Sequence, residues 1–433
     1  MRLTLFKNTV LLFIFLGISC RSTNGSDVEE TKLDTDVSKT DDFATNQSST
    51  VDKPILIGAN QIGLYLPLLK DKRIGIVANQ TSVLSVLQRV QIDASTMGSK
   101  TVSHHLVDYL HDYNGIEVKK VFAPEHGFRG NADAGEVVKD GLDTKTGLPI
   151  VSLYGKNKKP SKSQLRDLDL VVFDIQDVGA RFYTYISSLH YVMEACAENN
   201  VPLLILDRPN PNGHYIDGPI LELAHKSFVG MHPVPVVHGM TIGEYAKMIN
   251  GEDWLANGAK CDITVIPMKN YSHEMAYSLP IKPSPNLPND VSINLYPSLC
   301  FFEGTSISVG RGTSLQFQIY GSPFLPPTNY SFTPQPNHGA KYPKHENKVC
   351  HGYDLSNTSS LNGLNLNYLI NAYNATVDKD KFFNSNGFFT KLAGTKKLRQ
   401  QIEDGLTEAQ IKATWKSGLD GFKKTRASYL LYD

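Results

Sequence analysis

Short apolar runs alternate with helical stretches from about residue 55 to about residue 267. We expect strands at 73–78, 118–123, 150–154, 169–175, 201–206 and 261–266. The run at 169–175 is apolar almost throughout, as in a strand that is buried on both faces. This alternation of strands and helices predicts an α/β fold with a Rossmann-like, mostly parallel sheet covered by helices on both faces.

Two of the intervening helices have clear N-terminal signals. Ser161 with Gln164, and Thr241 with Glu244, have the spacing of a capping box. A further helix is expected at 102–113, where apolar side chains recur with a helical period, and this would place the pair His104-His105 on a helix. Another is expected at 185–198.

The pattern changes after about residue 267. A Pro- and Asn-rich stretch at 280–297 suits a crossover between domains, and short strand-like pieces follow at 301–320. Helices are expected at 365–375, 395–405 and 407–431, the last bent at Gly418 and Gly421. We therefore expect a Rossmann-like domain at 54–270 and a smaller α/β auxiliary domain at 271–433.

The first twenty residues predict export. Arg2 and Lys7 precede a short apolar run, Val10–Ser19, which ends at Cys20. The run is too short for a mature membrane-spanning helix and has the layout of a secretory signal. Small residues before the cysteine resemble a bacterial lipoprotein signal, so we expect lipidation of Cys20 and a membrane anchor on the periplasmic or cell-surface side. The alternative is an ordinary cleaved signal with an incidental cysteine.

Residues 21–53 are rich in Ser, Thr, Asn and Asp and contain few large apolar side chains. Such a segment cannot bury enough surface to order itself, so we expect a disordered tether. As a flexible coil it would reach on the order of 30 Å.

The balance of charge gives no reason to expect a nucleic-acid partner, because 43 Lys and Arg residues match 43 Asp and Glu residues. No dinucleotide, phosphate-loop, zinc-protease or serine-hydrolase motif is present, so we expect no cofactor and no metal. Four cysteines outside the signal lack zinc spacing and are expected to be buried free thiols: Cys196, Cys261, Cys300 and Cys350.

Polar side chains follow four of the expected strands. Ligands of open parallel sheets bind beyond the carboxyl ends of the strands, so we expect these side chains to share one site. They are Asn79, Gln80, Glu125, His126, Asp174, Gln176, Asp177 and Asp207.

Three clusters could carry chemistry, and each has a simpler structural interpretation. Glu125 could be a catalytic acid beside His126, or it could cap a helix. Asp174 and Asp177 could supply a second carboxylate and Arg181 an anion-binding group, or they could form an internal ion pair. A third cluster, Glu303 with Arg311, could close the cleft from the opposite side, or it could lie in a tight turn with solvated charges.

Several longer segments together resemble the bacterial exo-β-N-acetylmuramidase family. They are Asn79-Gln-Thr81, Pro124-Glu-His-Gly-Phe-Arg-Gly130, Asp133-Ala-Gly-Glu136, Asp174-Ile-Gln-Asp-Val-Gly-Ala-Arg-Phe-Tyr-Thr-Tyr185, Asp207-Arg-Pro-Asn-Pro211, Phe302-Glu-Gly304 and Arg426-Ala-Ser-Tyr-Leu-Leu-Tyr432. The resemblance implies a Rossmann-like domain, an auxiliary domain and an active site in the cleft between them. It also implies release of N-acetylmuramic acid from the non-reducing ends of peptidoglycan fragments.

The resemblance places the glutamate of its Pro-Glu-His-Gly motif on Glu125, which we expect to be the general acid. Its partner could be Asp177, Asp174, Glu303 or the 2-acetamido group of the substrate. The lactyl carboxylate of the sugar calls for an arginine, for which the candidates are Arg129, Arg181 and Arg311. The other expected substrate-binding residues are Asn79, Gln80, Asp174, Gln176, Tyr183 and Asp207.

Two other functions remain open from the sequence. One is a metal-dependent hydrolase that would use Glu125, His126, Asp174, Asp177 and Asp207 as ligands. The other is a non-catalytic lipoprotein that binds muropeptides in the same cleft.

Overall fold

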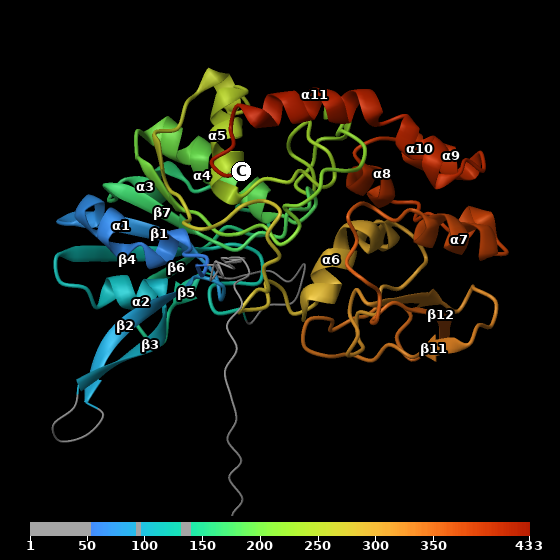
Figure 1. The fold of residues 1–433 in the computed structure, drawn as a ribbon, viewed down its shortest axis with the longest axis horizontal. Helices are drawn as coiled ribbons and strands as arrows, with labels where there is room; N and C mark the ends of the chain where they lie inside the picture. The colour runs from blue at the N-terminus through green and yellow to red at the C-terminus, as the bar shows by residue number, and fades with distance from the viewer. Residues whose placement is uncertain (1–52, 92–96, 131–139) are drawn as a thin grey trace, which may run out of the picture. The chain divides into compact units, whose positions relative to one another are not determined.

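A seven-stranded sheet organises the fold, with strand order β5-β6-β4-β1-β7-β8-β9 (Figure 1). Its parallel strands are β1 (Lys72–Ala78), β4 (Ile116–Ala123), β6 (Pro149–Ser152), β7 (Leu170–Asp174), β8 (Leu203–Leu206) and β9 (Ile263–Ile266). At one edge β5 (Gly141–Leu142) pairs antiparallel with β6. Counted along the chain, the parallel strands have the order 3-2-1-4-5-6 of the Rossmann fold, which confirms the expected fold class.

This computed structural model describes residues 53–91, 97–130 and 140–433, and residues 53–433 belong to one unit. The expected signal, the lipidation at Cys20, nearly all of the tether and the motif segment 133–136 lie outside the described residues. Within the described ranges, no helix is long and apolar enough to cross a membrane.

Helices cover both faces of the sheet. Alternate residues of its central strands accordingly belong to two different hydrophobic cores. Ile74 and Ile76 of β1 face a core with α1 (Ile62–Leu69) and α2 (Leu106–His111). Val77 faces the other core. That second core contains side chains of α3 (Lys162–Leu165), α4 (Tyr185–Asn199) and α5 (Ile242–Gly251). Both expected capping boxes are present, at the starts of α3 and α5.

An antiparallel hairpin that we did not expect from the sequence extends from the sheet (Figure 1). It consists of β2 (Val83–Gln91) and β3 (Met97–His105). The expected helix at 102–113 is therefore wrong in its first part, because residues to His105 pair with β2. His105 instead caps α2, where its Nδ1 accepts a hydrogen bond from the Val107 amide at 3.2 Å.

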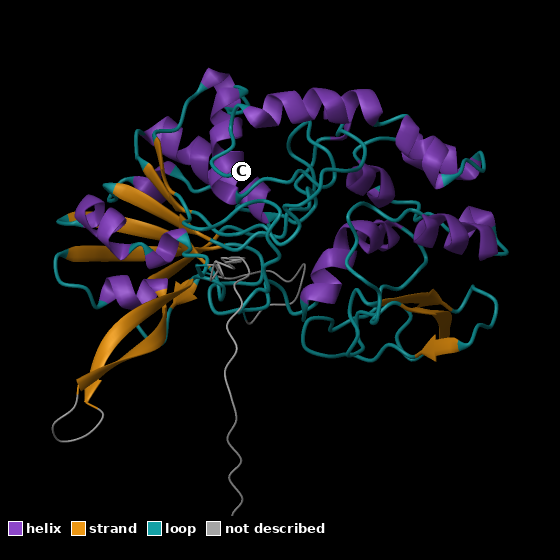
Figure 2. Cartoon of the chain, in the orientation of Figure 1, coloured by secondary structure: helices purple, strands orange, loops and turns teal. Residues whose placement is uncertain are grey.

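The C-terminal part combines a small sheet with short helices (Figure 2). Its sheet has the order β10-β12-β11, formed by β10 (Ile319–Ser322), β11 (Tyr330–Phe332) and β12 (Cys350–Asp354). Its α-helices are α6 (Asp290–Leu299), α7 (Asn367–Ala375), α8 (Phe388–Ala393), α9 (Lys397–Glu403), α10 (Glu408–Ala413) and α11 (Lys416–Ala427). The 3₁₀ turns of the described chain are η1 (Gly58–Asn60), η2 (Leu223–His225), η3 (Ala256–Gly258), η4 (Cys300–Gly304) and η5 (Lys379–Lys381).

The stretch expected as a crossover includes the start of α6, which has a capping box of Asn289 and Ser292. Two expectations for this part need correction. The strand-like pieces expected at 301–320 are η4 and turns that lead into β10. The expected closing helix is two helices, α10 and α11, and Gly418 and Gly421 lie within α11.

One hydrophobic core continues from the large sheet into the C-terminal helices. It includes Val171 and Phe173 of β7 together with Phe301, Leu398 and Trp415. The expected domain boundary at residue 270 stays a prediction. The four described cysteines are free and buried, as expected.

Candidate active site

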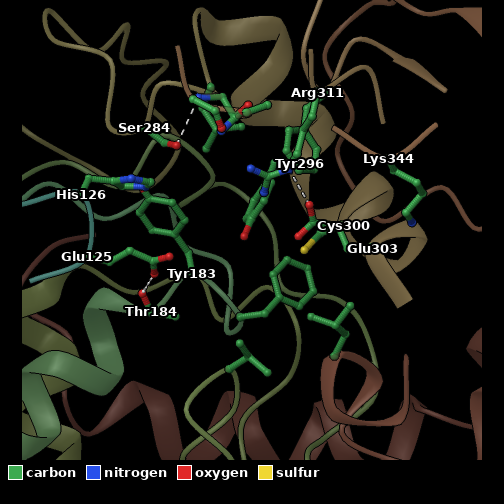
Figure 3. A pocket seen from close by; sticks show the side chains of 18 of the residues that line it. Glu125, His126, Tyr183, Thr184, Ser284, Tyr296, Cys300, Glu303, Arg311 and Lys344 are labelled. Carbon is green, nitrogen blue, oxygen red and sulfur yellow. Dashed lines mark hydrogen bonds and ion pairs between the residues drawn. The ribbon is translucent and has the colours of Figure 1, made fainter. Parts of the chain in front are cut away.

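A cavity of about 830 Å³ brings together five of the expected site residues. They are Glu125, His126, Tyr183, Glu303 and Arg311. Glu125 and His126 lie on one side of the cavity, and Glu303 and Arg311 lie on the opposite side (Figure 3). The cavity therefore lies between the end of the parallel strand β4 and a segment that begins after α6.

Two hydroxyl groups hold the Glu125 carboxylate. Tyr154 Oη donates to Oε1 at 2.9 Å, and Thr184 Oγ1 donates to Oε2 at 2.7 Å. Burial and the neighbouring Glu125 charge raise the pKa of Tyr154, so its phenol keeps its proton and remains a donor. The carboxylate is thus fixed in one orientation at the wall of the cavity, which suits proton transfer to a bound substrate.

The backbone at Glu125 is tied to the turn after β1. Tyr185 Oη lies 3.4 Å from the Glu125 carbonyl oxygen and accepts a hydrogen bond from Asn79 Nδ2 at 2.8 Å. Asn79 Oδ1 in turn accepts from the amide and the hydroxyl group of Thr81. Asn79 is completely buried and does not line the cavity, so its contacts hold Glu125 in place through Tyr185.

His126 has a backbone conformation that is uncommon for a residue with a side chain. Its φ is 69°, and Gly127 follows with φ 75°. The turn is closed by a 3.0 Å bond from the Gly127 amide to the Pro124 carbonyl. This tight reversal directly after β4 places both Glu125 and His126 at the cavity, where His126 is 4% exposed.

The opposite wall carries an ion pair. Arg311 Nε lies 2.6 Å from Glu303 Oε1, and each side chain is 24% exposed. Burial lowers the pKa of Arg311, but the Glu303 carboxylate more than offsets this and raises it above its usual value. Within the described residues the Nη groups of Arg311 make no hydrogen bond, so they remain available for an anion in the cavity.

Lys344 holds the backbone of this wall in place through hydrogen bonds. Its Nζ donates to the carbonyl oxygens of Phe302, Thr305 and Ile307 at 3.1, 2.5 and 2.9 Å. Burial lowers the pKa of Lys344 to about 8. Lys344 also lines the cavity, so one ammonium group joins the segment that carries Glu303 to a second lining loop.

Comparison with known proteins places the chain in a family. The model described as exo-beta-N-acetylmuramidase NamZ, N-terminal, matches residues 74–291, and its C-terminal counterpart matches residues 294–432. The chain belongs to the exo-β-N-acetylmuramidase NamZ family. This confirms the resemblance inferred from the motifs and the expected class of enzyme, a glycosidase.

A peptidoglycan beta-N-acetylmuramidase NamZ from Bacillus subtilis (strain 168) is 39% identical over 396 residues, which cover 85% of this chain and 89% of that protein. Two crystal structures of DUF1343 family proteins from Bacteroides fragilis NCTC 9343 are similar as well. One is 48% identical with a TM-score of 0.77, and each alignment covers 88% of this chain and 99% of the other chain. The second is 26% identical with a TM-score of 0.69.

In this NamZ-family chain, Asp174 does not reach the cavity. It is fully buried, and its carboxylate pairs with Arg208 at 2.6 and 2.8 Å. An internal Asp–Arg pair was the simpler interpretation of this cluster, but the structure assigns it to Arg208 rather than to Arg181. The expectation that Asp174 contacts substrate is therefore corrected.

Arg181 is an internal clamp rather than a substrate ligand. Its side chain is fully buried and donates to the carbonyl oxygens of four residues, Pro219, Val234, Leu392 and Ala393, at 2.7 to 3.0 Å. Burial lowers the pKa of Arg181 to about 9. The guanidinium joins the segment before α5 to the end of α8, and Arg181 does not line the cavity.

Asp177 is also buried away from the cavity. Its Oδ2 accepts from the Gly179 amide at 2.7 Å, and Oδ1 has no partner within the described residues. Burial raises the pKa of Asp177 to about 7. This carboxyl group is not in a position to act as the second catalytic group.

Asp207 anchors the chain near its last residues. It accepts hydrogen bonds from Thr241 Oγ1 at 2.7 Å, the Gly243 amide at 2.8 Å and Tyr432 Oη at 2.6 Å. Burial raises the pKa of Asp207 to about 6. Asp207 is fully buried, so its expected contact with substrate is corrected to a structural contact.

Arg129 lies outside the cavity lining as well. Its guanidinium pairs with Asp108 at 2.8 Å and with Asp143 at 2.7 Å. Arg311 is therefore the one of the three candidate arginines that the structure places at the cavity.

The two expected glutamines donate hydrogen bonds to backbone carbonyl oxygens and do not face the cavity. Gln80 Nε2 donates to the Pro283 carbonyl at 3.1 Å, which Tyr183 Oη also contacts at 2.8 Å. The next residue, Ser284, lines the cavity. Gln176 Nε2 donates to the carbonyl oxygens of Pro209 and Asp177 at 2.6 and 2.8 Å. Neither glutamine lines the cavity.

The ligand set of a metal-dependent hydrolase is not assembled. Glu125 and His126 line the cavity, whereas Asp174, Asp177 and Asp207 have other partners. In the part of the chain that the structure describes, no group of three or more His, Cys, Asp or Glu side chains is placed to hold a metal ion.

The sequence did not reveal Tyr154, Thr184 or Lys344 as site residues. Tyr154 and Thr184 could have been found by their position, since one follows a strand and the other lies in a family motif next to α4. Lys344 has no such signal, because its role depends on carbonyl groups 37 to 42 residues away.

Proposed function

We propose that this protein is an exo-acting glycoside hydrolase that releases N-acetylmuramic acid from the non-reducing ends of peptidoglycan fragments. The observation that carries the proposal is the cavity in which a doubly hydrogen-bonded Glu125 faces the Glu303–Arg311 pair. Membership of the NamZ family supports the same reaction class.

In the proposed mechanism Glu125 is the general acid. It gives its proton to the glycosidic oxygen as the bond between that oxygen and the anomeric carbon breaks. Water then adds to the anomeric carbon and its released proton restores Glu125. The developing positive charge on the sugar is met either by Glu303 or by the 2-acetamido group of the substrate.

Arg311 gives the site a means to select a muramic acid unit. That sugar differs from N-acetylglucosamine by its lactyl ether, which carries a carboxylate. The Nη groups of Arg311, which make no hydrogen bond within the described part of the chain, can donate two parallel hydrogen bonds to such an anion. His126 and Tyr183 line the same space and would contact the remainder of the ring.

The test is mass spectrometry of the products formed from two defined disaccharides. One has N-acetylmuramic acid at the non-reducing end, and the other has N-acetylglucosamine there. We expect release of the terminal sugar from the first and not from the second. Equal cleavage of both, or of neither, would contradict the proposal.

We further propose that the protein is exported and held at a membrane through a lipid on Cys20. The support is the order of charged residues, apolar run and cysteine in residues 1–20. In the native bacterium, Cys20→Ala should move the protein from the membrane fraction to a soluble or secreted fraction. An unchanged membrane fraction would rule out this anchor.

A further inference from the structure

One loop at the cavity is fixed on both sides of an exposed tyrosine. Before Tyr342, Asn337 and Ala340 exchange two backbone hydrogen bonds at 3.1 Å, and Asn286 Nδ2 donates to the Gly339 carbonyl at 2.7 Å. After it, the Lys344 ammonium is bonded to three carbonyl groups. The backbone around Tyr342 is therefore held in place although its side chain is not packed.

Tyr342 is 92% exposed, the most exposed aromatic side chain in the described chain, and yet it borders the cavity. Exposed apolar side chains are common singly on protein surfaces and need no explanation by themselves. Tyr342 differs because it lines the cavity that contains Glu125 while nearly all of its side chain is exposed to solvent. Lys344, two residues further along the chain, lies across the cavity from Glu125 (Figure 3).

The direction of the substrate follows from the reaction. An enzyme that removes the terminal unit from a non-reducing end holds that unit inside the cavity, and the rest of the fragment leaves through the opening. The first group to pass Tyr342 is the sugar that becomes the leaving group. A tyrosine ring offers a rigid apolar face, which can lie against the C–H face of a sugar, and a hydroxyl group that remains in water.

We propose that Tyr342 is the platform for the sugar on the leaving side of the cleaved bond, an N-acetylglucosamine ring in peptidoglycan. This inference rests on the proposed function and adds a specificity-determining residue to it. Tyr342 makes no contact with the reacting atoms; it improves the binding of substrates that have a ring in that position.

Two substrates with the same N-acetylmuramic acid unit test the proposal. One has N-acetylglucosamine as the leaving group, and the other is the β-fluoride, whose leaving group has no ring. In Tyr342→Ala the ratio of kcat/KM for the disaccharide to kcat/KM for the fluoride should fall about 5- to 10-fold, mainly through KM. Tyr342→Phe and Tyr342→Trp should keep the ratio, because each retains an aromatic face.

Tyr113→Ala is a matched control, since Tyr113 is 42% exposed and does not line the cavity. It should leave the ratio unchanged. An unchanged ratio in Tyr342→Ala would overturn the inference and leave the proposed function standing. A loss confined to fragments with stem peptides would also overturn it, in favour of a peptide contact. If the unmodified protein released no N-acetylmuramic acid from either substrate, both the proposed function and this inference would fall.

Discussion

Thr184 Oγ1 lies 2.7 Å from Glu125 Oε2 and donates a hydrogen bond to it, although 59 residues separate the two in sequence. Thr184 directly precedes α4, and Glu125 follows β4. The carboxylate is therefore oriented by the relative placement of two βα units rather than by its own loop. The same relationship makes its chemistry sensitive to changes on both elements.

Replacing Glu125 with Gln should reduce turnover about 10²- to 10⁴-fold, the usual contribution of a general acid. The amide keeps the size of the side chain and can accept from one of the two hydroxyl donors, so the thermal unfolding midpoint should change little. Sugar release and thermal unfolding measured on the same preparation test this. Turnover close to that of the unmodified enzyme would remove Glu125 from the role of acid.

Thr184→Val should lower kcat about 10-fold with little change in KM, because a hydrogen bond to a charged oxygen is lost while the shape is kept. Thr184→Ser retains the hydroxyl group and should recover most of the loss. This rescue distinguishes a positioning role from a packing role. If Ser and Val variants were equally impaired, the hydroxyl group would not be the relevant feature.

Arg311→Ala should lower kcat/KM for muramic acid substrates by about 10- to 100-fold, the range for a lost charge-assisted hydrogen bond. The methyl ester of the lactyl group lacks the negative charge, and the variant should discriminate little between ester and free acid. Arg129→Ala is the control, because Arg129 pairs with Asp108 and Asp143 outside the cavity lining. An Arg311 variant that still preferred the free acid would show that another group binds the carboxylate.

Arg181→Ala should destabilise the protein by more than about 3 kcal/mol, since four buried carbonyl groups lose their donor at once. Urea unfolding measures this loss. Arg399→Ala, which breaks an exposed pair with Glu403, should cost less than about 0.5 kcal/mol. A small effect at Arg181 would mean that water replaces the guanidinium.

Asp177 should make the protein less stable as the pH rises from about 4 to about 7. Its pKa in the folded state is raised to about 7 from an ordinary 3.8, so over this range the unfolded chain releases a proton that the folded chain retains. The loss at neutral pH is up to about 4 kcal/mol. The stability of Asp177→Asn minus that of the unmodified protein should therefore rise across this interval. A difference that does not change with pH would contradict the raised pKa.

Local signals in the sequence predicted most of the large sheet. The strand at 169–175 is short and largely apolar, and the capping boxes at Ser161 and Thr241 occur where the helices start. The hairpin of β2 and β3 was not predicted, because pairing with β2 overrides the helical spacing at 102–105. Local preference is a weak guide where a partner strand is available.

The site was predictable in its centre and not at its margins. Glu125 and His126 follow a parallel strand, and the topology alone brings them to the ligand-binding edge. The same rule suggested Asp174, Asp177 and Asp207, but buried partners neutralise or hold those groups. Contacts between distant residues decide which carboxylate faces the cavity and which pairs with an arginine. An example is the pair of Arg208 and Asp174, which are 34 residues apart. The spacing of residues in the sequence does not reveal such contacts.

The bond from Tyr432 to Asp207 has a consequence for any attempt to divide the gene. Asp207 follows β8, and Tyr432, which is 225 residues further along the chain, also receives a 2.9 Å hydrogen bond from the Met268 amide. Leu431 donates to Glu244 at 2.9 Å in the same place. The portions matched by the N- and C-terminal family models are therefore not interchangeable modules. If the N-terminal portion were expressed alone, Asp207 and Glu244 would lose their hydrogen bonds to Tyr432 and Leu431. Only fragment complementation with the C-terminal portion would restore these bonds.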